Sequence, residues 1–242
     1  MIGTLLNVTG ILAGGIAGLI RSKPLSRAQE ASFKVVLAAF IVFYGLRLTW
    51  ISLNGSLYAI CKQLLIVVLA LILGKFAGRA LRLQEFSNRL GQQARARLAA
   101  VRPEDPERAA TGFKTCAALF CAAPLGILGA VQEGLSTPPY FYALGAKAVI
   151  DGLATMGFAP LFGRSVLLSA IPVLAFQGSI TLLCGRFLQP LLTPHHLVDP
   201  VNAVGGLLVF CVALVMLELK KVELTAYLPS LVFAPLITWV WS

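Results

Sequence analysis

Charged residues are scarce in this 242-residue sequence, and their scarcity excludes most soluble folds. Only 12% of the residues are charged, 58% are hydrophobic, and the mean hydropathy is +0.85. A soluble domain has roughly 25% charged residues. A soluble core of this length could not bury so much apolar surface, so the composition predicts that lipid is the main solvent.

Common catalytic and metal-binding motifs are missing as well. The sequence has no Walker loop, no GxGxxG after a strand, no HExxH and no GxSxG elbow. None of the cysteines forms a CxxC pair, and all lie in or beside apolar runs, where a thiol packs as a small hydrophobic group. His195 and His196 are adjacent, which makes a poor chelate, and no third strong ligand is near. We therefore expect no enzyme activity, no cofactor and no metal site.

Long apolar stretches dominate what is present. Residues 1–20 are apolar from the start and lack the basic n-region of a signal peptide, so we expect them to form a first membrane span. A spanning helix takes about 20 residues. The stretches of suitable length are 2–20, 35–53, 57–77, 113–131, 140–162, 165–185, 201–217 and 225–241. The sequence predicts an all-α fold, with residues 1–242 forming one integral membrane domain of about eight transmembrane helices, one or two of them broken.

The distribution of lysine and arginine predicts how this bundle is oriented. With the N-terminus outside, the cytoplasmic connections contain most of the basic residues: Arg21, Lys23, Arg27, Lys34, Arg79, Arg82, Arg89, Arg95, Arg97, Arg102, Arg108, Lys114, Arg164, Lys220 and Lys221. Because cytoplasmic loops are enriched in these residues, we expect both termini outside the cell membrane. The net charge of +10 then has the lipid bilayer as its partner, and we expect no nucleic-acid binding because no such motif is present.

The only long connection, residues 78–112, combines arginines with apolar residues at near-helical spacing. The apolar positions are Leu81, Phe86, Leu90 and Leu98. The pattern is typical of an amphipathic helix on the inner leaflet, with the proline-containing run at 102–106 breaking it. We expect anionic headgroups to bind between Arg79 and Arg108. The alternative is a solvated linker.

Lys147 and Asp151 are the most informative polar residues inside a predicted span. They are four residues apart, so they face the same side of a helix. An ionisable group in hydrocarbon costs about 2.5–3.5 kcal/mol on insertion scales, and opposite charges lower that cost. Two interpretations stay open: a proton or ion relay or substrate anchor, and a structural ion pair that fixes helix packing.

The sixth predicted span combines a proline with polar groups. Pro172 is expected to kink the helix, so that Gln177, Ser179 and Thr181 line the opened backbone. Broken helices of this kind bind ions and solutes in transporters. The alternative is a kinked packing helix whose hydroxyls bond to its own carbonyls.

Further polar candidates lie in the other spans. The fourth span contains Pro124, Gly126 and Gly129, and we expect it to be a broken helix like the sixth. Glu133 follows these residues, and its plainer interpretation is an interface residue. Asn7 and Asn202 would supply amide ligands or link helices. Arg47 lies mid-span, where its best partners would be Asp151 or Glu133. Glycine pairs in the first and third spans (14 with 18, 74 with 78) are spaced for close helix contact.

Several segments together resemble a known family. They are GTLLN at 3–7, GAVQEGL at 129–135, KAVIDG at 147–152, PVLAFQGSIT at 172–181, AVGG at 203–206 and LPSLVFAP at 228–235. They resemble the YqgA/YdfK-like family of bacterial inner-membrane proteins, domain of unknown function 554. The family usually has Gln-Asp-Gly where this chain has Gln-Glu-Gly at 132–134, and the 80–112 connection does not match. The resemblance implies a bacterial cytoplasmic membrane protein and supplies no catalytic residues.

Three functions remain in competition. The leading hypothesis is an ion- or proton-coupled permease for a small polar solute, in which Asp151 binds a cation or proton and Lys147 tunes it. The candidate binding residues are Asp151, Lys147, Gln177, Ser179, Thr181, Glu133, Asn7, Asn202 and Arg47. The second is a membrane-embedded enzyme or flippase for an anionic lipid, and the third is a structural or regulatory subunit. The solute, the coupling ion and homo-oligomer formation are left open.

Overall fold

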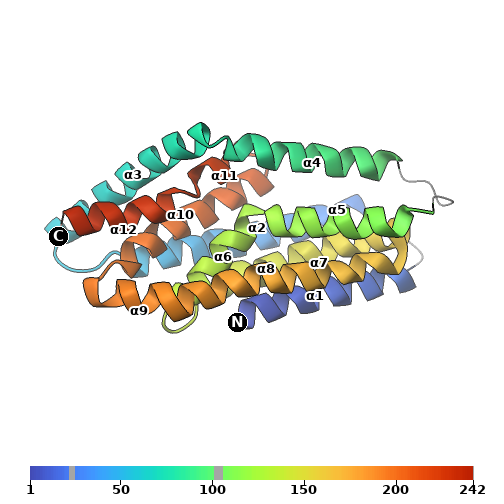
Figure 1. Cartoon of the computed structure of the whole chain (residues 1–242), viewed down its shortest axis with the longest axis horizontal. Helices are drawn as coiled ribbons and strands as arrows, with labels where there is room; N and C mark the ends of the chain where they lie inside the picture. The colour runs from blue at the N-terminus through green and yellow to red at the C-terminus, as the bar shows by residue number, and fades with distance from the viewer. Residues whose placement is uncertain (22–24, 101–105, 242) are drawn as a thin grey trace.

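The helices of this chain run mostly along one long axis, and the C-terminus lies at one end of the bundle (Figure 1). The computed structural model describes residues 1–21, 25–100 and 106–241, and it contains no strand in these ranges. The predicted all-α helical bundle is therefore confirmed.

Every predicted span coincides with helix. Single helices correspond to five of them: α1 (Ile2–Ile20), α2 (Arg27–Ile51), α3 (Leu57–Ala80), α7 (Tyr142–Phe162) and α10 (Val198–Met216). The other three are composite. The fourth is α5 (Arg108–Ala122) and α6 (Pro124–Leu135), the sixth is η1 (Gly163–Ser169) and α8 (Ala170–Leu183), and the last is α11 (Leu224–Tyr227) and α12 (Ser230–Val240). The segments η2 (Cys184–Leu188), α9 (Gln189–Leu192) and η3 (Thr193–His195) lead from α8 to α10.

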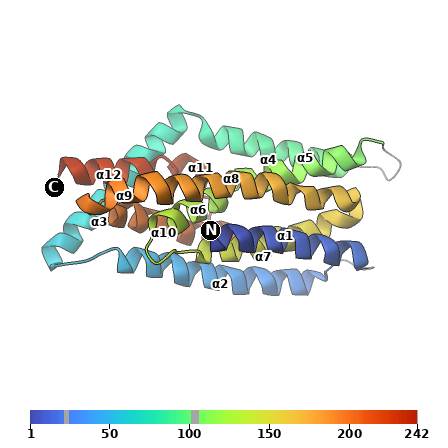
Figure 2. The ribbon, with the colours of Figure 1, turned by 60° about the horizontal axis from the view of Figure 1, so that its bottom comes forward.

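A count by length and composition alone gives fewer membrane-crossing helices than the eight predicted. By length and composition, five helical segments of the described chain could cross a membrane, or six if α5 and α6, bent by 55°, form one span. This count treats Tyr142–His195 as a single 54-residue segment and leaves out the short Leu224–Val240. The chain reverses at η1, so α7 and α8 run in opposite directions (Figure 2). That reversal accounts for one predicted span that the count merges.

Glycines bring α1 and α7 into backbone contact. A Cβ atom on Gly14 would lie 2.0 Å from the carbonyl oxygen of Gly152, and one on Gly10 would lie 2.3 Å from that of Ala148. In the same way, a Cβ on Gly78 of α3 would lie 2.0 Å from the carbonyl oxygen of Ala226. Only glycine fits at such contacts. The predicted close approach at the glycine pairs is confirmed. It determines which residues of α1 lie level with which residues of α7 along the bundle axis.

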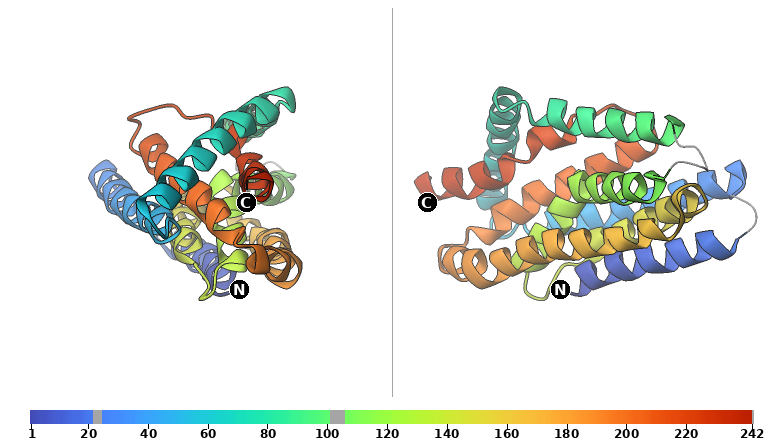
Figure 3. Two further views of the ribbon diagram at one scale, coloured as in Figure 1. Left: turned by 90° about the vertical axis from the view of Figure 1, so that its left-hand side faces the viewer. Right: turned by 45° about the vertical axis from the view of Figure 1, so that its right-hand side comes forward.

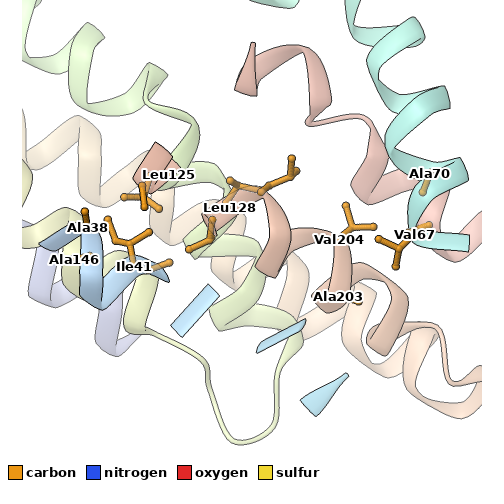
Figure 4. Close-up of a cluster of buried hydrophobic side chains, with 14 residues drawn as sticks. Ala38, Ile41, Val67, Ala70, Leu125, Leu128, Ala146, Ala203 and Val204 are labelled. Atoms are coloured by element: carbon orange, nitrogen blue, oxygen red, sulfur yellow. The ribbon is translucent and has the colours of Figure 1, made fainter. Parts of the chain in front are cut away.

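The larger hydrophobic core lies between α2, α3, α6, α7, α10 and α12 (Figure 4). Leu125 of α6 lies near Ile41 of α2 in this core, and Val204 of α10 lies beside Val67 of α3 (Figure 4). The outer surface, by contrast, exposes many large apolar side chains along α1, α2, α3 and α8. Apolar surface of this extent is typical of a protein that contacts lipid.

The 78–112 connection contains α4 (Leu83–Ala100), which packs beside α5 and α11 (Figure 3). Leu98 packs against the core next to α5, and Leu90 is half-buried, whereas Leu81 and Phe86 are exposed. Half of the predicted apolar face therefore packs against the protein, and the other half is exposed. Residues 102–105 of the predicted break lie outside the described residues.

The α1–α7 contact makes a first prediction. Replacing Gly14 with alanine should lower the melting temperature, because its Cβ would collide with the α7 backbone, and overpacking costs about 1–3 kcal/mol. Gly157→Ala on α7 is the matched control, since no atom lies within 4 Å of its Cβ. Thermal unfolding of both variants in detergent is the measurement. Equal melting temperatures for the two would show that α1 does not depend on this contact.

Candidate functional site

A cluster of polar side chains joins three helices in the interior. Lys147 and Asp151 of α7 form an ion pair, with 2.5 Å between Nζ and Oδ2. The Asn7 side chain of α1 donates from Nδ2 to Asp151 Oδ2 at 3.1 Å and to Gln177 Oε1 of α8, also at 3.1 Å. We call these four residues the central cluster. The structure thus brings together four of the nine candidates and confirms the predicted pairing on one helix face.

The central cluster is sealed from solvent in this conformation. Asn7 and Gln177 are 0% exposed, Lys147 1% and Asp151 4%. A buried charge is tolerated only when it is paired and hydrogen-bonded, and the two charges here cancel within one contact. The Asn7 amide provides the carboxylate with a further donor.

Two atoms of the cluster nevertheless have no hydrogen-bond partner in the part of the chain that the structure describes. They are the acceptor Asn7 Oδ1 and the donor Gln177 Nε2. Buried polar atoms are nearly always paired, because an unmade bond costs about 1–3 kcal/mol. The cluster therefore presents one acceptor and one donor that the protein itself does not use.

The break between α5 and α6 lies directly beside the cluster. Pro124 is the first residue of α6, where its missing N–H is harmless, and the two helices are bent by 55°. A Cβ on Gly126 would lie 2.8 Å from Lys147 Cε and 3.0 Å from Gln177 Nε2. Lys147 Nζ is also 5.9 Å from the ring centre of Phe120 at the end of α5. The predicted break in the fourth span is confirmed, and it leaves helix-end carbonyls and amides near the ion pair.

The sixth span differs from its prediction. Pro172 lies in the first turn of α8, where a proline removes no helical hydrogen bond, and α8 continues unbroken through residues 177–181. Ser179 is exposed and donates to the carbonyl of Ala175 in its own helix, so it lies away from the cluster. Thr181 donates to the carbonyl of Ala130 at 3.3 Å and links α8 to α6.

Glu133 of α6 does not belong to the central cluster. Its carboxylate lies at the N-terminus of α1. Its carboxylate accepts from the backbone N–H of Gly3 at 2.7 Å and that of Thr4 at 3.4 Å, and the α-amino group of Met1 is 3.2 Å away. A carboxylate at a helix N-terminus pairs with unused amides and with the positive end of the helix dipole. This geometry supports the plainer interpretation, in which Glu133 holds two helices together.

Arg47 and Asn202 lie in a separate cavity of about 500 Å³, which we call the outer cavity. Among the described residues, Arg47 forms an ion pair with neither Asp151 nor Glu133, the two partners that the sequence suggested. Its helix α2 packs mainly on α10, which places the guanidinium beside the 136–142 segment instead. Asn202 donates to Ser136 Oγ at 3.3 Å in the wall of the same cavity.

An aromatic group forms another wall of the outer cavity. The Tyr140 hydroxyl donates to the carbonyl of Tyr44 at 2.6 Å, and the rings of Tyr44 and Tyr142 stack at 3.8 Å. Burial raises the pKa of Tyr140 to about 12, although the nearby Arg47 opposes the rise. The hydroxyl therefore stays protonated and remains a donor at neutral pH.

Gln132 of α6 is a buried polar residue that is not among the candidates predicted from the sequence. It is 2% exposed, and both of its amide atoms lack a partner. An amide inside an apolar helix was the available signal. In the described part of the chain, no three His, Cys, Asp or Glu side chains gather as metal ligands would.

Comparison with known proteins gives full-length matches. The family described as "Protein of unknown function (DUF554)" matches residues 2–239. The chain is 28% identical over 240 residues to "Uncharacterized membrane protein YdfK" of Bacillus subtilis, covering 99% of this chain and 96% of that protein. It is 29% identical over 243 residues to "Uncharacterized protein YqgA" of Escherichia coli, covering 100% and 98%. No solved structure matches. The membrane assignment of the chain agrees with its apolar helices and with the name of the Bacillus relative.

The buried ion pair makes a second prediction. Asp151→Asn should lower stability by about 3–5 kcal/mol, because it leaves the Lys147 charge buried without a counter-charge. The double variant Lys147→Met with Asp151→Asn should recover much of that loss, since neither charge remains. Glu85→Gln, which removes an exposed pair with Arg89, is the control and should have little effect. A melting temperature for Asp151→Asn equal to that of the control would contradict a buried pair.

Proposed function

This chain belongs to the DUF554 family of proteins of unknown function, and from that premise we propose that it is an ion- or proton-coupled permease for a small polar solute. We place it in the cytoplasmic membrane of a bacterium. The observation that supports transport is the sealed central cluster beside the α5–α6 break.

The combination of features favours binding over simple packing. A purely structural ion pair needs neither a broken helix at its side nor unused amide atoms around it. Here Asn7 Oδ1 and Gln177 Nε2 are both buried without a partner among the described residues. They lie near the break between α5 and α6, and the end groups of helices generally lack intrahelical partners. Transporters bind ions and solutes at the middle of the membrane with this set of groups.

The ion pair suggests how binding and coupling would be linked. Lys147 is neutralised by Asp151 while the cluster is sealed. A proton or cation on Asp151 would remove that neutralisation, and Lys147 would then need another acceptor, such as a solute oxygen. Because Gly126 has no Cβ, the Lys147 side chain packs directly against the α6 backbone at the helix break. The buried pair would thus open only when solute and ion are exchanged together.

One face of α6 connects the central cluster with the outer cavity. Gly126 lies at the cluster, Gln132 one to two turns further, and Ser136 at the cavity wall. Between them Leu144 of α7, which is fully buried, packs on Gly129: a Cβ there would lie 2.8 Å from Leu144 Cγ. We infer that Leu144 blocks the path of a solute between the outer cavity and the central cluster. With the positive-inside orientation, the outer cavity is on the external side, and both termini lie outside.

The flippase alternative has weaker support. At the two ends of the proposed headgroup site, Arg79 bonds to Glu223 at 3.0 Å and Arg108 donates to the carbonyl of Pro160 at 2.8 Å. Both guanidinium groups are therefore already engaged within the protein. The exposed arginines of α4 remain available to the anionic leaflet, which accounts for a lipid contact without lipid transport.

Reconstitution in proteoliposomes tests the proposal. We expect the purified protein to transport at least one solute from a panel of amino acids, organic acids, sugars and inorganic ions. The folded double variant Lys147→Met with Asp151→Asn should lose at least about 90% of that flux, because it removes the charge exchange. Ser179→Ala on the same helix as Gln177 is the control and should keep the flux, since Ser179 faces outward. Flux retained in the folded double variant would show that transport does not use this ion pair. No flux from folded wild-type protein for any solute would favour the structural subunit.

The proposed closure makes a separate prediction. Leu144→Ala should raise solute exchange or leak several-fold, because it removes most of the side chain between the two polar regions. A core leucine-to-alanine change costs about 2–5 kcal/mol, so the melting temperature should be measured alongside. Val149→Ala, an exposed position on the same helix, serves as the control. Unchanged flux in a folded Leu144→Ala protein would place the closure elsewhere.

A further inference from the structure

The outer cavity contains two opposite charges that are not paired with each other or with any third charge. Arg47 of α2 and Asp199 of α10 both line it. Among the described residues, neither has an opposite charge within 4.0 Å. The partner of Arg47 is the neutral Tyr140 hydroxyl, and Asp199 interacts with His196 only at longer range. One cavity thus holds one unused cation and one unused anion.

The two charges lie on different elements, Arg47 on α2 and Asp199 on α10. Residues of the segment that connects α6 to α7 (Figure 2) also line the cavity. Ser136 and Asn202 add a hydroxyl and an amide that already bond to each other, so their positions are fixed. A cavity of about 500 Å³ is within the roughly 300–1,000 Å³ range of small-molecule sites.

We propose that the outer cavity is an entry site for a small zwitterion, a solute that has one carboxylate and one ammonium group, as a free α-amino acid does. The carboxylate would bind the planar fork of Arg47, and the ammonium would bind Asp199. Tyr140 and Tyr142 also line the cavity and add ring surface for the carbon chain of such a solute. A solute of one sign would satisfy only one wall and leave the other charge unused.

This inference rests on the proposed permease function, since it names the class of solute that would pass on to the central cluster. Like the outer cavity, the central cluster has one cation and one anion, Lys147 and Asp151. In the proposed mechanism these two residues would exchange each other for the charges of the solute. The class of solute and the occurrence of transport are nevertheless separate properties. Equilibrium binding tests the first without requiring the second.

The experiment is a titration of the full chain in detergent with alanine, propionate and ethylamine. Isothermal titration calorimetry measures the affinity for each of these probes. These molecules share a short carbon chain and differ in whether they have both charges, only the carboxylate or only the amine. We expect alanine to bind at least ~10-fold more tightly than either single-charge analogue. Glycine, leucine and glutamine extend the panel, because the cavity size does not specify the side chain.

Site variants assign the binding to this cavity. Arg47→Gln and Asp199→Asn should each weaken binding of the zwitterion by at least ~10-fold while the melting temperature without solute stays near that of wild type. Arg186→Gln removes an exposed cation that does not line the cavity, and should leave affinity unchanged. Equal affinity for propionate or ethylamine, no binding of any zwitterion, or full affinity in Arg47→Gln and Asp199→Asn would each overturn the inference. Solute flux that depends on Lys147 and Asp151 would still support the permease if the transported solute were not a zwitterion.

Discussion

The interior of this protein depends on the cost of burying charge. Lys147 and Asp151 are almost completely inaccessible to solvent, and each is tolerated only because the other is within bonding distance. The pair therefore constrains everything around it. Asn7 must reach Asp151 from α1, Gln177 must reach Asn7 from α8, and Gly126 must leave space for the lysine stem. Movement of α1 or α8 away from α7 would expose the two charges, which stay side by side on α7.

Glycine contacts are what allow three helices to meet at that pair. Gly10 and Gly14 set α1 against the α7 backbone, so Asn7 reaches the level of Asp151. Without a hydrophobic driving force between helices in lipid, close backbone packing and interhelical polar bonds hold such a bundle together. The same contacts fix how far the helices would have to separate before water could enter. The close packing of α1 on α7 is therefore also what keeps the central cluster sealed from water.

The polar residues of the interior divide into regions with different chemistry. The central cluster has paired charges and unused amide atoms, whereas the outer cavity has unpaired charges and partly solvated walls. Glu133 belongs to neither, because its carboxylate is occupied by the amides at the beginning of α1. Buried Leu144 and the small residues of α6 lie between the two regions. For the permease that we propose, this division would give a solute a polar entrance and a sealed binding centre.

Sequence patterns were sufficient for the membrane setting, the helical class, the positions of most helices and the Lys147–Asp151 pair. These depend on apolar length and on helical periodicity, which are local properties. The break at Pro124 was also visible locally, but the effect of Pro172 was not, because it depends on where α8 begins. Which of the polar side chains meet was decided only by tertiary packing. Arg47 and Ser179 lie away from the cluster because the neighbours of α2 and the rotation of α8 are set by contacts with other helices.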